Sequence, residues 1–184
     1  MSLTTVGAVT NDLFPAWRTL PEPPPPRLVG TYEVEVDYDF TQAETLELAG
    51  YRWNGVCASE GLEPIFVTPD RVGQQKVMVS LWSFGNPVCM SYARLFFAAG
   101  PNHPIDFWTL CMLGHAHPAI TKRREVIGLG SVFGRSPTVN GGQKSQELWA
   151  PYLEMGVERS ITLTEFSDLA EEYTVFATVP KLAL

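Results

Sequence analysis

Residues 31–40 alternate between apolar or aromatic side chains and acidic ones, in the order Thr-Tyr-Glu-Val-Glu-Val-Asp-Tyr-Asp-Phe. A period of two is that of a β-strand, whose successive side chains point to opposite faces of a sheet. A helix would scatter both sets around its axis, so this segment constrains the fold more than any other. We expect a half-buried strand with an apolar face formed by Tyr32, Val34, Val36, Tyr38 and Phe40. Its other face carries four carboxylates, which we call the acidic ladder: Glu33, Glu35, Asp37 and Asp39.

Seven further segments combine β-branched or aromatic residues with flanking turn residues, and each predicts a short strand. They are residues 45–56, 76–84, 91–98, 105–113, 125–133, 159–166 and 173–179. Glycine and proline, fifteen of each, interrupt the chain between many of them. Residues 146–155 are expected to form a short helix limited by Pro151. Eight strands in total predict an all-β fold, an eight-stranded β-sandwich or jelly roll.

The first 29 residues differ in composition from the rest of the chain. They contain a proline run at residues 21–26, which is typical of a stiff, extended polyproline II segment. We expect an extended N-terminal arm over residues 1–29 and a single β-sandwich or jelly-roll domain over residues 30–184. Phe14 and Trp17 are the residues expected to anchor this arm, either on its own domain or on a neighbouring chain.

Charge is concentrated in one part of the chain. The formal net charge is −7, and residues 31–63 carry all of it, with eight acidic residues against Arg52 alone. Such a balance disfavours a phosphate-binding surface, and we expect no direct contact with nucleic acid. Lys122, Arg123 and Arg124 form a short run that we call the basic cluster. Such a short run is typical of a solvated loop. Its charge is also complementary to that of the acidic ladder, so the two form opposing patches if copies of the chain pack against one another.

Three cysteines, Cys57, Cys89 and Cys111, lie far apart in apolar or small-residue surroundings. Their odd number and spacing predict reduced thiols in the core.

The first residues lack the basic and apolar regions of a secretory signal, and no apolar run approaches the roughly 20 residues that a membrane helix needs. We expect a soluble protein made in a reducing compartment, without membrane contact.

His115 and His117 follow the apolar segment 105–113. If this segment is a strand that continues, both imidazoles project from one face about 7 Å apart and can share a metal ion. His103, Asp106 or Glu125 is then the third ligand of a zinc or iron site. The His-x-His pair resembles the first half of the metal motif of the cupin family, which implies a β-barrel that holds a divalent metal. The chain departs from that motif because no Glu follows His117 closely and no later histidine exists.

The acidic ladder also has a metal interpretation, because calcium prefers hard oxygen ligands. The same four residues would equally form a solvated face that prevents stray strand pairing, or a surface for a cationic partner. No catalytic residue is predicted, because no Gly-x-Ser-x-Gly elbow, Walker loop or Cys-x-x-Cys pair occurs in the sequence.

Three hypotheses about function follow. The first is a structural, self-associating protein, namely a viral coat or virion subunit or a projecting domain. The second is a small cupin-like β-barrel, either a metal-dependent enzyme or a ligand-binding protein, that uses His115 and His117. The third is an adaptor whose proline run docks on a partner domain. The all-β pattern, the arm and the separated charges favour the first, which implies a homo-oligomer without a cofactor.

Overall fold

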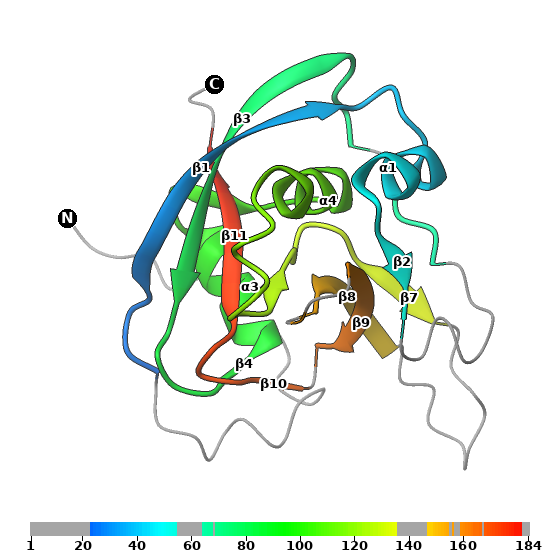
Figure 1. Ribbon diagram of the computed structural model, residues 1–184. Helices are drawn as coiled ribbons and strands as arrows, with labels where there is room; N and C mark the ends of the chain where they lie inside the picture. Colours follow the sequence, from blue (N-terminus) through cyan, green and yellow to red (C-terminus); the bar gives the residue numbers. More distant parts are fainter. Residues whose placement is uncertain are drawn as a thin grey trace, which may run out of the picture.

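The computed structural model describes residues 23–54, 64–67, 69–135, 147–154, 156, 159–166 and 168–181. In chain order its elements are β1 (Arg27–Asp37), α1 (Gln42–Ala49), β2 (Arg52–Trp53), β3 (Gln74–Ser83), β4 (Val88–Cys89), α3 (Met90–Ala99), β5 (Asn102–Pro104), α4 (Phe107–Ala116), β6 (Val126–Ile127), β7 (Phe133–Arg135), β8 (Glu147–Leu153), β9 (Ser160–Glu165), β10 (Leu169–Ala170) and β11 (Val175–Pro180). The described part of the chain is therefore mostly β, as expected (Figure 1).

Nine of these strands form one mixed sheet. Its main path is β1-β3-β11-β6-β8-β9-β2, with β5 beside β11 and β7 beside β8, while β4 and β10 form a separate pair. Most neighbours are antiparallel, but β11 runs parallel to β6, and β2 runs parallel to β9. The β-sandwich and the jelly roll are not confirmed, because nine of the eleven described strands form one large sheet that is accompanied by helices.

The strand predicted for residues 31–40 is confirmed as β1, an edge strand paired along its length with β3. Val34, Val36 and Tyr38 are buried, whereas Glu33 and Glu35 are exposed. The strand also begins earlier than the expected domain boundary, since Arg27 already pairs with β3. At its other end the regular strand stops before Tyr38, and Phe40 is 37 % exposed rather than buried.

The sheet has a hydrophobic core on each face. On β11, Val175, Ala177 and Val179 belong to the same cluster as α4 and Ala49 of α1. Phe176 points to the other face, where its ring lies 6.1 Å from that of Phe97 on α3. Because neighbouring strand residues point in opposite directions, α4 and α1 cover one face and α3 covers the other. The domain therefore has three layers, with the sheet in the middle.

Two predicted strands are wrong because they fold as apolar helices. Residues 105–113 lie largely in α4, of which seven residues are buried, and residues 91–98 lie in α3. Most of α4 is buried, and a short apolar run buried on most sides has no clear period, so a buried helix and a buried strand look alike in sequence. Helix α3 buries only Met90, Ala93 and Phe97, but its exposed side is also apolar, so polarity does not reveal its period. Asp106 begins α4, where its carboxylate accepts a hydrogen bond of 2.8 Å from the backbone N–H of Thr109.

The strand predicted for residues 45–56 is wrong in its first half, most of which is helix α1, whereas the short strand β2 lies in its second half. Thr41 and Glu44 form a capping box at the start of this helix, and Gly50 ends it in the left-handed conformation, with φ of 70°. Conversely, the helix predicted for residues 146–155 is strand β8, which pairs with β9, β6 and β7. Residues 125–133 contain only the short strand β6 and the first residue of β7.

Three other predicted strands are confirmed, at residues 76–84, 159–166 and 173–179, where β3, β9 and β11 lie. Among the described residues no helix is both long and apolar enough to cross a membrane.

Candidate functional site

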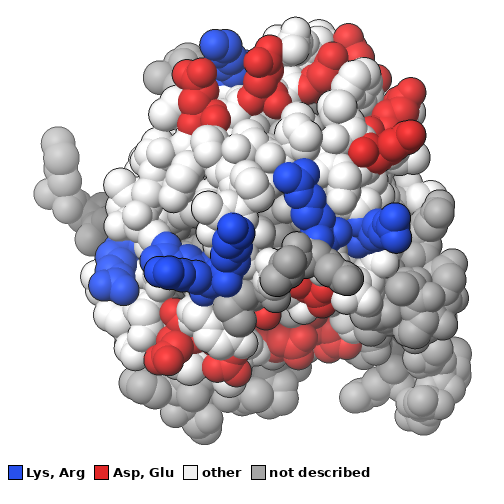
Figure 2. Space-filling view, in the orientation of Figure 1, with Lys and Arg blue, Asp and Glu red and all other residues white. Residues whose placement is uncertain are grey.

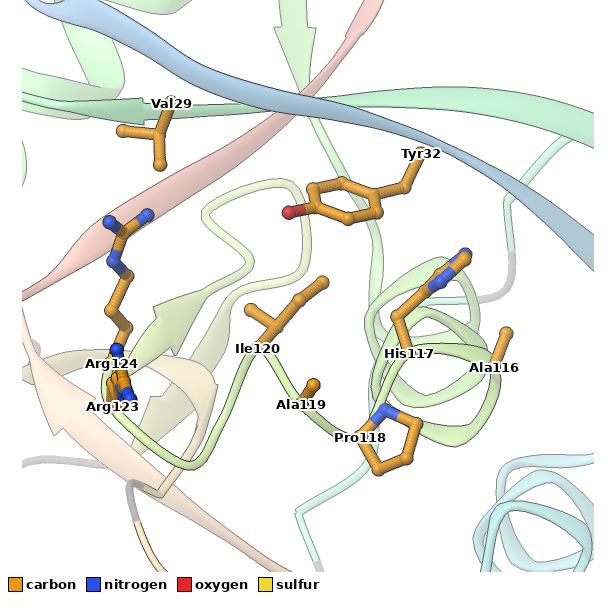
Figure 3. A pocket seen from close by; sticks show the side chains of 9 residues that line it. All are labelled: Val29, Tyr32, Ala116, His117, Pro118, Ala119, Ile120, Arg123 and Arg124. Carbon is orange, nitrogen blue, oxygen red and sulfur yellow. The ribbon is translucent and has the colours of Figure 1, made fainter.

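A surface pocket of about 540 Å³ lies between β1 and the segment that follows α4, and we call it the β1 pocket. Its residues come from β1, from the end of α4 and from the segment that follows α4 as far as the basic cluster (Figure 3). They are Val29, Tyr32, Ala116, His117, Pro118, Ala119, Ile120, Arg123 and Arg124. This lining combines apolar surface with two guanidinium groups, a phenol and an imidazole, and the described residues contribute no carboxylate to it.

Tyr32 forms the β1 side of the pocket. The pairing of β1 with β3 shifts between Leu28 and Gly30, which marks a bulge in the strand. A Cβ atom on Gly30 would lie only 2.9 Å from the hydroxyl oxygen of Tyr32, so the missing side chain leaves room for the ring. The hydroxyl of Tyr32 points into the pocket above Ile120 (Figure 3). It makes no hydrogen bond to any residue that the structure describes.

His117 joins the end of α4 to the edge strand. It is the C-cap residue of the helix, and its backbone N–H donates to the carbonyl of Leu113 at 2.9 Å. Its Nε2 lies 3.0 Å from the carbonyl oxygen of Glu33. Because a carbonyl only accepts, Nε2 carries the proton in this bond. The imidazole also lies 5.0 Å from the ring of Tyr32, so both rings support one wall of the pocket.

The basic cluster follows a turn in which the hydroxyl of buried Thr121 donates to the carbonyl of Pro118 at 3.2 Å. Arg123 and Arg124 line the pocket, whereas Lys122 does not. The guanidinium of Arg124 approaches the space above Ile120 from the side opposite the hydroxyl of Tyr32 (Figure 3). Within the described part of the chain neither arginine has an ion pair.

The geometry expected for a metal at His115 and His117 is wrong. Both residues lie at the end of a helix, where side chains two positions apart point in different directions. Nδ1 of His115 lies 3.4 Å from the carbonyl oxygen of Ala49 and 3.4 Å from Nη1 of Arg159, away from the contact that His117 makes. Glu125 instead accepts a hydrogen bond of 3.3 Å from the hydroxyl of Thr174.

Burial raises the pKa of the Glu125 carboxyl, and this hydrogen bond opposes the rise. Among the residues that the structure describes, no group of three or more His, Cys, Asp and Glu side chains could hold a metal ion.

The acidic ladder divides into two parts. Glu33 and Glu35 are exposed on the strand, and Glu33 forms an ion pair of 3.4 Å with Lys76 on β3. Asp37 and Asp39 instead shape the turn, since Asp37 accepts from the backbone N–H of Asp39 at 3.0 Å and Asp39 accepts from that of Gly73 at 2.8 Å. Of the four carboxylates, only those of Glu33 and Glu35 therefore have no hydrogen bond to the described backbone.

Some predicted site residues lie outside the described part of the chain, namely Phe14 and Trp17, and so does Cys57. Sequence reasoning missed the role of Tyr32, which it assigned to the core together with Val34. Its hydroxyl was the available signal, because a phenol on an apolar strand face needs a polar neighbour or an opening to solvent. His117 and the basic cluster were noted separately, but nothing in the sequence joins them to Tyr32.

A second pocket, of about 480 Å³, lies at the other edge of the sheet beside β2. It contains Arg52 and Arg159, but a carboxylate stands next to it. Glu154 accepts hydrogen bonds from Asn54, at 2.7 Å, and from the hydroxyl of Ser160. This site therefore supplies its own negative charge, unlike the β1 pocket.

Comparison with known protein families, curated proteins and solved structures found no match for this chain. Its function is therefore argued from the geometry of its own residues.

Proposed function

We propose that this chain is a self-associating structural protein of the viral coat or virion class, in which the acidic ladder of one copy contacts the basic cluster of the next. The observation that carries the proposal is the separation of the two charges on the domain. On the face shown in Figure 2, acidic side chains at the upper margin lie apart from a band of Lys and Arg side chains below them, and further acidic side chains lie below that band.

The two patches lie on opposite sides of the sheet. Glu33 and Glu35 alternate with Val34, which packs in the core beneath α4, so both carboxylates point away from that helix. The basic cluster lies on the helix side, where Arg124 shares the β1 pocket with Tyr32. This arrangement favours pairing between chains over pairing within one chain.

An interface between two different patches is heterologous. Each copy then offers one free acidic face and one free basic face, so the assembly grows until it closes into a ring or continues as a filament. Such growth is what a coat or virion protein requires. Carboxylates on an edge strand also oppose direct strand-to-strand pairing, so side-chain charges dominate the contact and salt should weaken it.

Light scattering after size-exclusion chromatography tests the proposal with charge-reversed chains. Reversing the ladder with Glu33→Lys and Glu35→Lys should give monomers, and so should Arg123→Glu with Arg124→Glu. A mixture of the two variants should assemble again, because residues 33 and 35 are then positive on one chain and residues 123 and 124 are negative on the other. A chain that carries all four substitutions should also regain assembly, because its own two patches are again complementary.

Arg52→Glu is the matched control, since it changes charge by the same amount per site at the opposite edge of the sheet. It should leave the assembly intact. A wild-type chain that stays monomeric at every concentration and at low salt would refute the proposal. The arm is tested separately by removing residues 1–26, and an unchanged assembly would exclude Phe14 and Trp17 as its anchors.

The alternative is a metal-dependent enzyme or ligand-binding protein that uses His115 and His117. One observation favours its ligand-binding form, namely that His117 lines the β1 pocket. Metal analysis of the purified chain separates the two proposals. A monomer that holds one stoichiometric zinc or iron ion, lost on replacing His117 by Ala, would support the alternative over the coat proposal.

A further inference from the structure

We propose that the β1 pocket binds a small organic phosphate, with the phosphate at Arg123 and Arg124 and the organic body against Tyr32 and Ile120. This site goes beyond self-association, because it concerns a small molecule and is complete within one chain.

Charge is the first argument. Two neighbouring guanidinium groups line the pocket, no described carboxylate lines it, and neither arginine has an ion pair with any described residue. Arginine presents planar, paired N–H donors that match phosphate oxygens, and such charge-assisted bonds are stronger than neutral ones. The pocket therefore selects an anion despite the chain's net charge of −7.

Shape is the second argument. A volume of about 540 Å³ suits a compact ligand. Val29, Ile120 and the ring of Tyr32 supply apolar surface beside the arginines, and all three also pack on the core beneath α4. An inorganic anion would leave this surface uncovered, so an organic phosphate fits better than phosphate alone.

The third argument is a hydrogen-bond donor aimed into the space. The hydroxyl of Tyr32 has no hydrogen bond to the described residues and faces the guanidinium of Arg124 across the pocket (Figure 3). The bond from His117 to the carbonyl of Glu33 and its contact with the ring of Tyr32 keep this wall in place. His117 is thus a positioning residue, and Gly30 leaves the room that the phenol occupies.

Calorimetric titration of the full chain tests the site with three probes, which are phenyl phosphate, inorganic phosphate and phenol. Phenyl phosphate should bind more tightly than either fragment, because only it uses both the charge and the apolar surface. Arg124→Gln and Arg123→Gln should each weaken its binding about tenfold or more, as expected for the loss of a charge-assisted hydrogen bond. Tyr32→Phe should weaken it roughly threefold to tenfold.

Arg52→Gln is the matched control, and it should leave the affinity unchanged. Equal affinity for phenyl phosphate and inorganic phosphate would overturn the site in favour of general charge attraction, and so would an equal loss of affinity in Arg52→Gln. The absence of any binding would also overturn the proposal. The titration is repeated on the chain with Glu33→Lys and Glu35→Lys, whose substitutions lie outside the pocket lining. If this variant still binds phenyl phosphate, the pocket proposal holds whether or not the wild-type chain assembles.

Discussion

Gly114 lies on the buried side of α4, and replacing it by alanine should destabilise the protein although alanine favours helices. A Cβ atom at this position would overlap the hydroxyl oxygen of Tyr51 and lie 2.6 Å from Cδ1 of Leu153. Tyr51 is 5 % exposed and Leu153 is fully buried, so neither side chain can swing into solvent. Overpacking of this kind costs about 1–3 kcal/mol or more, against a gain of about 1 kcal/mol in helix propensity. We expect a net loss of up to about 2 kcal/mol in the free energy of unfolding.

A double-mutant cycle with Tyr51→Phe identifies the cause. The hydroxyl of Tyr51 is buried and has no hydrogen-bond partner among the described residues, so removing it should be neutral or stabilising. It also removes the closest atom to the new methyl group. Gly114→Ala should therefore cost about 1 kcal/mol less in the chain that carries Tyr51→Phe than in the wild type.

Urea denaturation followed by circular dichroism measures all four chains of the cycle. Gly100→Ala serves as the control, because a Cβ atom there would meet its nearest neighbour, the carbonyl oxygen of Phe96, at an ordinary 3.5 Å. The reasoning is refuted if Gly114→Ala stabilises the protein, or if its effect is the same with and without the hydroxyl of Tyr51.

Three further predictions concern pH, a helix cap and the acidic ladder. Burial raises the pKa of Tyr51 to about 12, above its unfolded value near 10, so the free energy of unfolding should keep its full value below pH 10 and fall between pH 10 and 12. Tyr51→Phe should reduce this fall in thermal melts at alkaline pH. The part of the fall due to Tyr152, whose pKa burial also raises to about 12, should remain. Asp106→Ala should lower the free energy of unfolding in urea by about 1 kcal/mol, because it removes the N-cap of α4. Asp39→Ser should cost more stability in the same assay than Glu35→Ser, which should change the free energy of unfolding by less than about 0.5 kcal/mol. Equal effects would contradict the division of the ladder into carboxylates that bond to the backbone and carboxylates that do not.

The strand around Val34 could be predicted because its pattern is local. Alternation with a period of two depends only on the geometry of the strand backbone and on the burial of one face. Each of the strands β1, β3, β9 and β11 has at least one buried face. Helix α1 was also predictable in principle. Thr41 and Glu44 are the two residues of a capping box, and Gly50 stands where a helix ends in the left-handed conformation.

Helices α3 and α4 could not be identified from their own residues. In α3, exposed Leu95 and Phe96 are as apolar as buried Phe97, so polarity does not mark the buried face. Phe107, Leu110 and Leu113 are fully buried, as are their neighbours on other sides of α4, so no polar face reveals a period. Whether such a run becomes a helix or a strand depends on which surfaces surround it in the folded chain. The same limit explains β8, whose ladder with β9 overrides a local sequence that suggested a helix.

The β1 pocket shows the limit for function. Tyr32, His117 and Arg124 were each visible in the sequence, but only the packing of α4 on the sheet brings the end of that helix to the edge strand.

The sequence by itself determined that β1 is a half-buried strand and that the excess negative charge belongs to its segment, because alternation and composition are properties of neighbouring residues. Only the tertiary structure decided that Glu33 and Glu35 lie on the opposite side of the sheet from the basic cluster, and that Tyr32 and Arg124 line one pocket. These relations depend on strand order and helix docking, which arise from contacts between distant parts of the chain and leave no mark on any single segment.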